Sequence, residues 1–377
     1  MDGEGFVIHS TLIFPPSLVI TFAALLGAAV GSFVNVCIFR LPREGLGVSR
    51  PRRSFCPSCG FEIAWYDNIP IAGWLVLGGR CRACRAPFSA RYLLVEAGTA
   101  LVFVLVAQRF LLGHAPSLPA ALAVSALGAA LVAVSFIDLD HKLIPDEITL
   151  PGMALAPLVV LAAPEVHTVD GSLSRVLAGV GSALAALPIP ASLRTTPVLL
   201  LAVPAAAALS AAAAMLAYSA YWKAAHPTSP KRFRDGWLAG ALAAEAGAVG
   251  ALSLLRPEII LAPGIYAFWA GLAGMLAGSS LVLLVGIIGS KVFRKPAMGF
   301  GDVKLMGLLG AFTGWAGVLA GFFIACILGS IAGIYLLLRH GNRYLPFGPF
   351  LALGAFSLVL WPQAFARLLR WYAGLFV

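Results

Sequence analysis

Residues 17–39 read S-L-V-I-T-F-A-A-L-L-G-A-A-V-G-S-F-V-N-V-C-I-F, an apolar run without a charged side chain. A helix needs about 20 apolar residues to cross the hydrocarbon core of a bilayer, so this run predicts a membrane span. Asp2 and Glu4 precede it, and Arg40 and Arg43 follow it. Basic residues favour the cytoplasmic side, which places the N-terminus outside. A cleavable signal peptide would have a basic start and a shorter apolar core, so the run is predicted to stay in the protein.

The composition of the whole chain points the same way. Hydrophobic residues make up 60% of the 377 residues and charged residues 11%, with a mean hydropathy of +0.93. Soluble domains have about 25% charged residues, so the chain is predicted to lie in a membrane. Its apolar runs are long and continuous rather than short and alternating, which favours helices over a β-barrel. The net charge of +10 does not indicate nucleic-acid binding, because the basic residues cluster in a few loops between apolar runs.

Further apolar runs predict an all-α polytopic membrane protein with about eight to ten transmembrane helices. Most of them are clear, and the run 305–338 can hold one long helix or two short ones. The clear runs are 93–112, 118–137, 148–163, 237–255, 264–290 and 347–361.

The middle of the chain is open to two interpretations. The run 173–193 is broken by Pro188 and Pro190, and a further span is predicted at 197–222. If 173–193 spans the bilayer, the basic loop that follows 197–222 falls outside. If it lies along the outer interface or re-enters the membrane without crossing it, that loop falls inside, and loop charge favours this second interpretation.

Three domains are predicted from these patterns. Residues 1–40 hold the first transmembrane helix, and 41–91 form a cytoplasmic, cysteine-rich domain that is dense in arginine. Residues 92–377 form the main transmembrane domain, with an extra alanine-rich insertion at about 173–255.

Aspartates next to two of the apolar runs are candidates for chemistry. Asp138 and Asp140 directly follow one run, and Asp302 directly precedes another. Carboxylates near a bilayer are energetically costly and are usually functional or paired. Two close carboxylates can share one proton, so that one activates water and the other protonates a leaving amine. Helix capping and proton or ion transport are the competing explanations, and Asp146 before its apolar run fits a cap better than a catalyst.

Two glycines lie just before Asp302. Gly299 and Gly301 precede Asp302 in G-F-G-D, and they would let a substrate backbone approach closely. The sequence has no H-E-x-x-H, G-x-S-x-G or P-loop pattern, so zinc metalloprotease, serine hydrolase and ATP-driven chemistry are not indicated.

Four cysteines predict a metal site in the cytoplasmic domain. They form the pairs C-P-S-C (Cys56 and Cys59) and C-R-A-C (Cys81 and Cys84), separated by residues 60–80. Four thiolates at this spacing are typical of a tetrahedral structural Zn²⁺ site. Redox pairs and plain buried cysteines are the alternatives, although no βαβ pattern surrounds them as a thioredoxin-type pair would require.

Six ordered motifs resemble the type IV prepilin peptidases, the bifunctional leader peptidase/N-methyltransferases of pilus and type II secretion systems. The motifs are G-S-F-V-N-V-C-I-F-R-L-P (31–42), the paired cysteine loop with D-N-I-P (67–70), R-Y-L-L-V-E (91–96), I-D-L-D-H-K-L-I-P-D-E-I-T-L-P-G (137–152), G-F-G-D-V-K-L-M (299–306) and P-F-G-P-F-L-A-L-G-A (346–355).

The resemblance implies a membrane aspartyl endopeptidase of the G-x-G-D type. One catalytic aspartate would be Asp302, and the other would be Asp138, seven residues before Pro145, with Asp140 as the rival for that role. The residues expected to support the catalytic loop are Asp140, Pro145, Gly299, Gly301 and Lys304.

The substrates implied by the resemblance are prepilins and pseudopilins in the bacterial inner membrane. Their short basic leader would be cut after a glycine at the cytoplasmic face, and the new N-terminus would be methylated from S-adenosylmethionine. A non-catalytic scaffold or a transporter of the same fold is the alternative, and the oligomeric state is not predicted. Residues 152–298 separate Pro151 from Gly299, a connection longer than the family's usual two helices.

Overall fold

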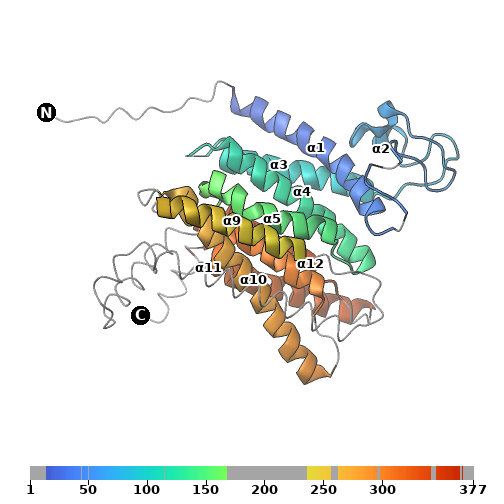
Figure 1. Ribbon diagram of the computed structural model, residues 1–377. Helices are drawn as coiled ribbons and strands as arrows, with labels where there is room; N and C mark the ends of the chain where they lie inside the picture. The colour runs from blue at the N-terminus through green and yellow to red at the C-terminus, as the bar shows by residue number, and fades with distance from the viewer. Residues whose placement is uncertain are drawn as a thin grey trace, which may run out of the picture.

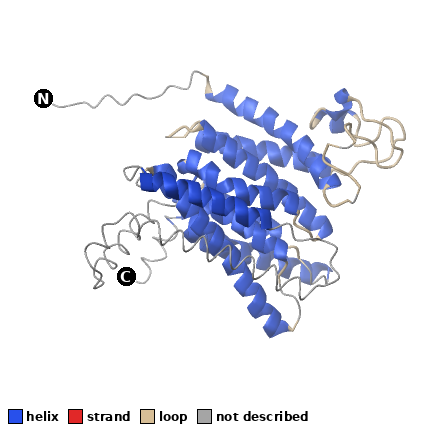
Figure 2. Ribbon diagram, in the orientation of Figure 1, coloured by secondary structure: helices blue, strands red, loops and turns tan. Residues whose placement is uncertain are grey.

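The computed structural model describes residues 14–167 except 44, 50 and 114, and then 236–255, 262–294, 298–340, 345–365 and 367. Within these ranges the chain is built of helices, and one longer loop carries the four cysteines (Figures 1 and 2). The predicted segments 173–193 and 197–222, together with the basic loop after them, lie outside the described residues.

The long helices coincide with the predicted apolar runs to within a few residues. Ser117 caps the helix Leu118–His141 by accepting a hydrogen bond from the Ala120 N–H at 3.3 Å, and Lys142 ends this helix in the left-handed conformation. The helices are α1 (Pro16–Arg40), α2 (Ala72–Val76), α3 (Arg91–Phe110), α4 (Leu118–His141), α5 (Asp146–Ala162), α9 (Gly236–Leu255), α10 (Pro263–Phe293), α11 (Phe300–His340) and α12 (Gly348–Leu360). Two short 3-10 turns, Trp65–Asn68 and Pro164–Val166, complete the described elements.

The fold class is confirmed as a helical, multi-pass membrane protein. Five described helices are long and apolar enough to cross a bilayer: α1, α3, α4, α10 and α11. Large apolar side chains such as Phe22, Leu25 and Phe323 are exposed on them, which suits contact with lipid.

The helices form two packed groups that meet along α4. The first group is α1, α3 and α4, and its core contains Val34, Val95 and Ile137. The second group surrounds α11, which packs against α5, α10 and α12. Helix α4 also contacts α12, so the two groups make one continuous bundle, as Figure 1 shows.

Glycines allow α10 and α11 to pack closely against each other. A Cβ atom at Gly274 would lie 2.1 Å from the carbonyl oxygen of Gly310, and a Cβ at Gly310 would lie 2.1 Å from that of Gly274. Neither position can hold a larger residue without moving backbone. Small residues serve this purpose in membrane bundles, where close van der Waals packing replaces the hydrophobic drive between helices.

Helix α11 is interrupted at Gly314, which settles the question left open for residues 305–338. Gly314 has φ 68° and ψ 175°, a conformation outside the helical region that glycine adopts at low cost. The run therefore holds two helical parts joined at a kink.

Candidate active site and metal centre

The candidate aspartates and the cysteine loop lie at one end of the bundle. Asp138 is in the last turn of α4, and Asp302 is in the first turn of α11. Helix α1 ends and α3 begins at the same end, and the loop between them carries the cysteines (Figure 1). Residues far apart in the sequence thus converge where the loops meet.

Asp138 is buried against the start of α12. Its side chain is 6% exposed, and its Oδ2 accepts a hydrogen bond from the Gly348 backbone N–H at 3.0 Å. A Cβ atom at position 348 would lie 2.6 Å from the same oxygen. Only glycine therefore lets the backbone come this close to the carboxylate.

Asp302 is held in a similar way by a second glycine. It is 8% exposed, and its Oδ2 accepts a hydrogen bond from the Gly299 backbone N–H at 3.2 Å. The carboxylate reaches back from the first turn of α11 to the residue before the helix, as the third residue of a capping box does. Asp302 therefore does take part in helix capping, which was the competing explanation for this residue, and the same hydrogen bond holds its carboxylate in place.

Ile144 links the surroundings of the two aspartates. A Cβ atom at Gly301 would lie 2.7 Å from the Ile144 Cβ, and one at Gly348 would lie 3.4 Å from its Cδ1. The same side chain therefore packs against Gly301, which precedes Asp302, and beside Gly348, whose N–H binds Asp138. The two carboxyl groups lie within electrostatic range of each other. The space that Gly301 leaves is taken by Ile144, whereas the sequence suggested room there for a substrate backbone.

Asp140 points to a different neighbour. Its Oδ2 pairs with the Arg91 guanidinium, which also donates to the Phe136 carbonyl oxygen at 2.7 Å and lies over the Phe136 ring. The Asp140 side chain is 39% exposed. This residue therefore ties α3 to α4 at the bundle end, away from the Gly348 contact that holds Asp138.

Lys304 joins the starts of α11 and α5. Its side chain is 2% exposed, and its Nζ lies 3.0 Å from Asp146 Oδ1 and 4.6 Å from the centre of the Phe300 ring. Pro145 precedes α5, and its carbonyl oxygen accepts a hydrogen bond from the Thr149 N–H at 3.2 Å. Asp146 therefore does more than begin a helix, because it anchors the buried lysine two residues after Asp302.

The four cysteines form one cluster that could hold a metal ion. The sulfur atoms of Cys56, Cys59, Cys81 and Cys84 all lie within 4.8 Å of one another, and none is in a disulfide. The Cys56 and Cys84 sulfurs are 3.9 Å apart. Metal–sulfur bonds of about 2.3 Å in a tetrahedron place the sulfurs about 3.8 Å apart, so the donor set suits a tetrahedral ion.

Two matching turns present these sulfurs. Cys56 donates its N–H to the Phe61 carbonyl oxygen, and Cys81 donates its N–H to that of Ala86. Each second cysteine is followed by a residue with positive φ, Gly60 at 74° or Arg85 at 60°. The two turns bring the four thiols to one point.

The local environment also favours a thiolate at the first cysteine. Burial alone would raise the pKa of the Cys56 thiol, but hydrogen bonds from the backbone N–H groups of Cys59 and Ser58 and from the Cys59 and Cys81 thiols lower it to about 7. Hydrogen bonding to the neighbouring thiols has the opposite effect on Cys59 and raises its pKa to about 12, so the cluster gives up its first proton at Cys56. Thiolates rather than thiols bind metals. The loop is further tied by Arg82, which donates two hydrogen bonds to Asp67 and thereby lowers the pKa of that carboxyl.

Some residues of this region had no role in the sequence analysis. Gly348 stood in a motif without an assigned function, and Ile144 was an apolar residue between two aspartates. Arg40 ended an apolar run, and it donates to the carbonyl oxygens of Val48 and Pro51 at 2.9 and 2.6 Å, which fixes the start of the cysteine loop. The sequence shows an arginine at the end of this apolar run, but it does not show which carbonyl groups the side chain contacts.

Two family descriptions match separate parts of the chain. The Bacterial Peptidase A24 N-terminal domain matches residues 25–110, and the Type IV leader peptidase family matches residues 235–334. The first range contains the cysteine loop, and the second contains Asp302. No solved structure matches the chain.

Curated relatives are similar over almost the whole chain. A prepilin leader peptidase/N-methyltransferase of Myxococcus xanthus is 32% identical over 336 residues, which cover 89% of this chain and 68% of the relative. Proteins with the same description from Aeromonas hydrophila and Pseudomonas aeruginosa are 28% and 27% identical, and the matches cover more than nine-tenths of each chain.

Proposed function

This chain belongs to the type IV leader peptidase family, and from that membership we propose that Asp138 and Asp302 are its catalytic pair. The protein is a membrane peptidase that removes a leader peptide, and it also N-methylates the new N-terminus. No observation favours a transporter or a non-catalytic scaffold.

The observation that carries the assignment is the shared environment of two buried carboxylates. Each accepts a hydrogen bond from a glycine N–H, and Ile144 packs against Gly301 and Gly348, one glycine next to each carboxylate. Two buried carboxylates within electrostatic range of each other cannot readily both be ionised, so the pair would share a proton. Asp140, which is more exposed and paired with Arg91, lacks these features.

Peptide hydrolysis by such a pair needs two proton transfers. The ionised carboxylate takes a proton from a water molecule as that water attacks the scissile carbonyl carbon. The protonated partner supports the carbonyl oxygen and then delivers its proton to the leaving amine. The glycine N–H groups hold the carboxylates in place, and the Lys304–Asp146 pair fixes the start of α11 against α5.

The proposed substrates are prepilins and pseudopilins, cut after a glycine at the cytoplasmic face of the bacterial inner membrane. The charge of the site end supports this orientation, because the cysteine loop there carries Arg52, Arg53, Arg80 and Arg82, and basic loops stay inside. A substrate with a basic leader and a hydrophobic helix would present its cleavage site at this membrane edge.

The proposed cofactors are a structural Zn²⁺ and the methyl donor S-adenosylmethionine. Cys56, Cys59, Cys81 and Cys84 would hold the zinc, which would keep a small polar loop folded.

The test is cleavage of a prepilin by the purified protein in detergent. Asp138→Asn and Asp302→Asn preserve size but cannot exchange the proton, so each should lower the cleavage rate at least about 10³-fold. Asp140→Asn serves as the matched control and should lower it less than about tenfold. If Asp140→Asn abolishes cleavage while Asp138→Asn retains it, the assignment of the pair is wrong.

A further inference from the structure

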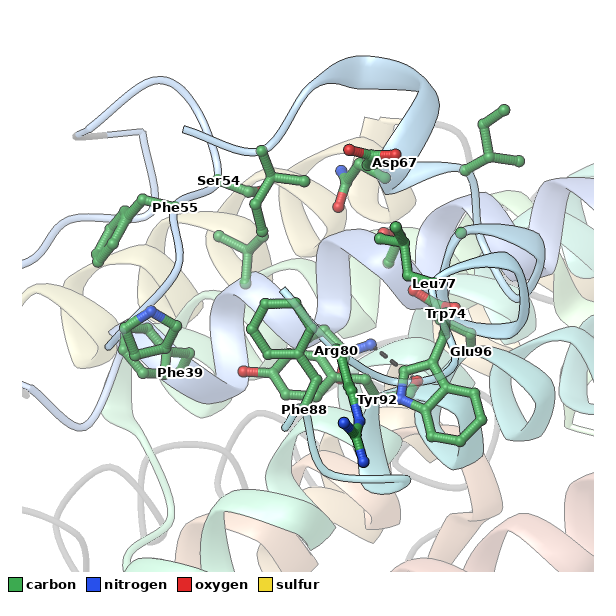
Figure 3. Close-up of a pocket in the computed structure, with 18 of the residues that line it drawn as sticks. Phe39, Ser54, Phe55, Asp67, Trp74, Leu77, Arg80, Phe88, Tyr92 and Glu96 are labelled. Atoms are coloured by element: carbon green, nitrogen blue, oxygen red, sulfur yellow. Dashed lines mark hydrogen bonds between the residues drawn. The ribbon is translucent and has the colours of Figure 1, made fainter. Parts of the chain in front are cut away.

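Methyl transfer needs a site for the methyl donor, and a cavity lies next to the cysteine loop. It has a volume of about 120 Å³ and is enclosed by the end of α1, the start of α3 and the loop between them. Figure 3 shows aromatic rings along it, from Phe55 and Phe39 at one end, past Phe88 and Tyr92, to Trp74 at the other. The cavity is therefore at the same bundle end as the aspartates, but it is built from other helices.

A buried acid, Glu96, lines this cavity. Glu96 is 8% exposed, and its Oε2 accepts a hydrogen bond from the Ile71 backbone N–H at 2.6 Å. Ser32 and Asn35 of α1 also approach its carboxylate. A Cβ atom at Gly31 would lie 2.7 Å from the Glu96 Cα, so α1 passes directly against the residue.

The loop backbone is strained where it meets this acid. Ile71 has φ 63°, a left-handed conformation that β-branched residues rarely adopt. Such strain persists only where surrounding contacts enforce it, and it occurs preferentially at functional sites. Here it directs the Ile71 N–H to Glu96 and thereby fixes the carboxylate in the cavity wall.

A second polar group in the wall has no partner among the described residues. The Nε1 atom of Trp74 is buried and makes no hydrogen bond there. A buried donor without an acceptor is unfavourable, because it has lost its hydrogen bonds to water. A hydrogen-bond acceptor on a bound ligand would give the Trp74 N–H a partner.

We propose that this cavity binds S-adenosylmethionine, an inference that rests on the methyltransferase half of the proposed function. The ligand's sulfonium is a cation, which aromatic faces and a buried carboxylate attract. Its adenine ring can stack on an aromatic side chain, and Arg80, exposed at the cavity, suits its carboxylate. A cavity of about 150 Å³ accommodates benzene, so this one takes one ring-sized part of the ligand while the rest lies in the opening.

Direct binding of S-adenosylmethionine and S-adenosylhomocysteine to the zinc-loaded, full-length protein tests the proposal. Glu96→Gln keeps an acceptor for the Ile71 N–H but removes the charge, and it should raise the dissociation constant for S-adenosylmethionine at least tenfold. The neutral S-adenosylhomocysteine should be affected less. Trp65→Ala is the control, since Trp65 is 80% exposed and outside the cavity wall, and it should change neither constant by more than twofold.

A second measurement does not depend on any variant. Ultraviolet cross-linking of the wild-type protein to methyl-labelled S-adenosylmethionine should place the label on peptides within 32–40 or 54–96. Label confined to peptides around Asp138, Asp302 or Gly348, or unchanged affinity in Glu96→Gln, overturns the cavity assignment.

Leader cleavage by the same preparation separates the two proposals. Cleavage without any binding of S-adenosylmethionine overturns the cavity assignment and leaves the peptidase intact. Binding at the cavity without cleavage of any prepilin supports the cavity and counts against the proposed catalytic pair.

Discussion

Replacing Gly348 by alanine tests whether the backbone of α12 positions a catalytic carboxylate. The alanine Cβ would lie 2.6 Å from Asp138 Oδ2, and 3.4 Å from the Ile144 Cδ1. The second contact is an ordinary van der Waals distance, but the first is not. The strain of Gly348→Ala therefore falls on the carboxylate.

The magnitude follows from the distance that the carboxylate must move. To restore a contact of 3.4 Å, Asp138 and the α12 backbone must separate by about 0.8 Å, which also stretches the 3.0 Å hydrogen bond from the Gly348 N–H. A misplacement of about 1 Å at a catalytic group can lower a rate about 10²-fold. That factor corresponds to about 2.7 kcal/mol of lost transition-state stabilisation.

The assay compares the rate of leader cleavage with thermal unfolding of the same preparation. Gly98→Ala is the matched control, because a Cβ atom at Gly98, inside α3, would meet nothing within 4 Å. That control should cleave at the wild-type rate and be as stable or slightly more stable, since alanine favours a helix by up to about 1 kcal/mol over glycine. Gly348→Ala should remain folded and lose about 10²-fold in kcat.

Either of two results would refute this reasoning. Wild-type cleavage by Gly348→Ala would mean that the position of Asp138 is not critical for the chemistry. An equal loss in Gly98→Ala would mean that glycine content, rather than the contact with the carboxylate, controls the rate.

Three further predictions concern the parts that hold the site. Asp146→Asn leaves the buried Lys304 ammonium without this carboxylate and should destabilise the fold by about 2–4 kcal/mol. Lys304→Met instead leaves the Asp146 carboxylate, which is 44% exposed and hydrated, and should destabilise the fold by about 1 kcal/mol or less. Equal shifts of the two unfolding midpoints would contradict this asymmetry. Cys59→Ser should reduce bound zinc from about one ion per chain to a small fraction by elemental analysis, because a tetrahedral site loses one of its four ligands; an unchanged metal content would rule out the proposed zinc site. Gly310→Ala should lower the stability by about 1–3 kcal/mol by forcing α10 and α11 apart, and Gly240→Ala, where a Cβ meets nothing within 4 Å, should not; similar losses in both would show that close packing at Gly310 is not the cause.

Local chain properties made most of the helices predictable. A run such as 17–39 has no alternative to a helix in a bilayer, because no water is present there to satisfy its backbone groups. The structure accordingly begins and ends α1 within a residue of that run. The kink at Gly314 was not decided by the sequence, since glycine permits an interruption of a helix but does not require one.

The choice between neighbouring aspartates depended on tertiary contacts. Asp138 and Asp140 differ by half a turn of α4, so they face different partners, and the sequence shows neither Gly348 on one side nor Arg91 on the other. Lys304 shows the same limit, because its partner Asp146 is far away in the sequence.

By itself, the sequence determined the membrane class, the positions of the described long helices and the residue types of the candidate site, since hydropathy, glycine content and cysteine spacing are local properties. Only the tertiary structure decided which carboxylates lie together, that the four thiols converge, and that aromatic rings and Glu96 enclose a cavity beside the cysteine loop. The physical reason is that these arrangements depend on close approaches between helices and loops, which are set by packing across long stretches of chain.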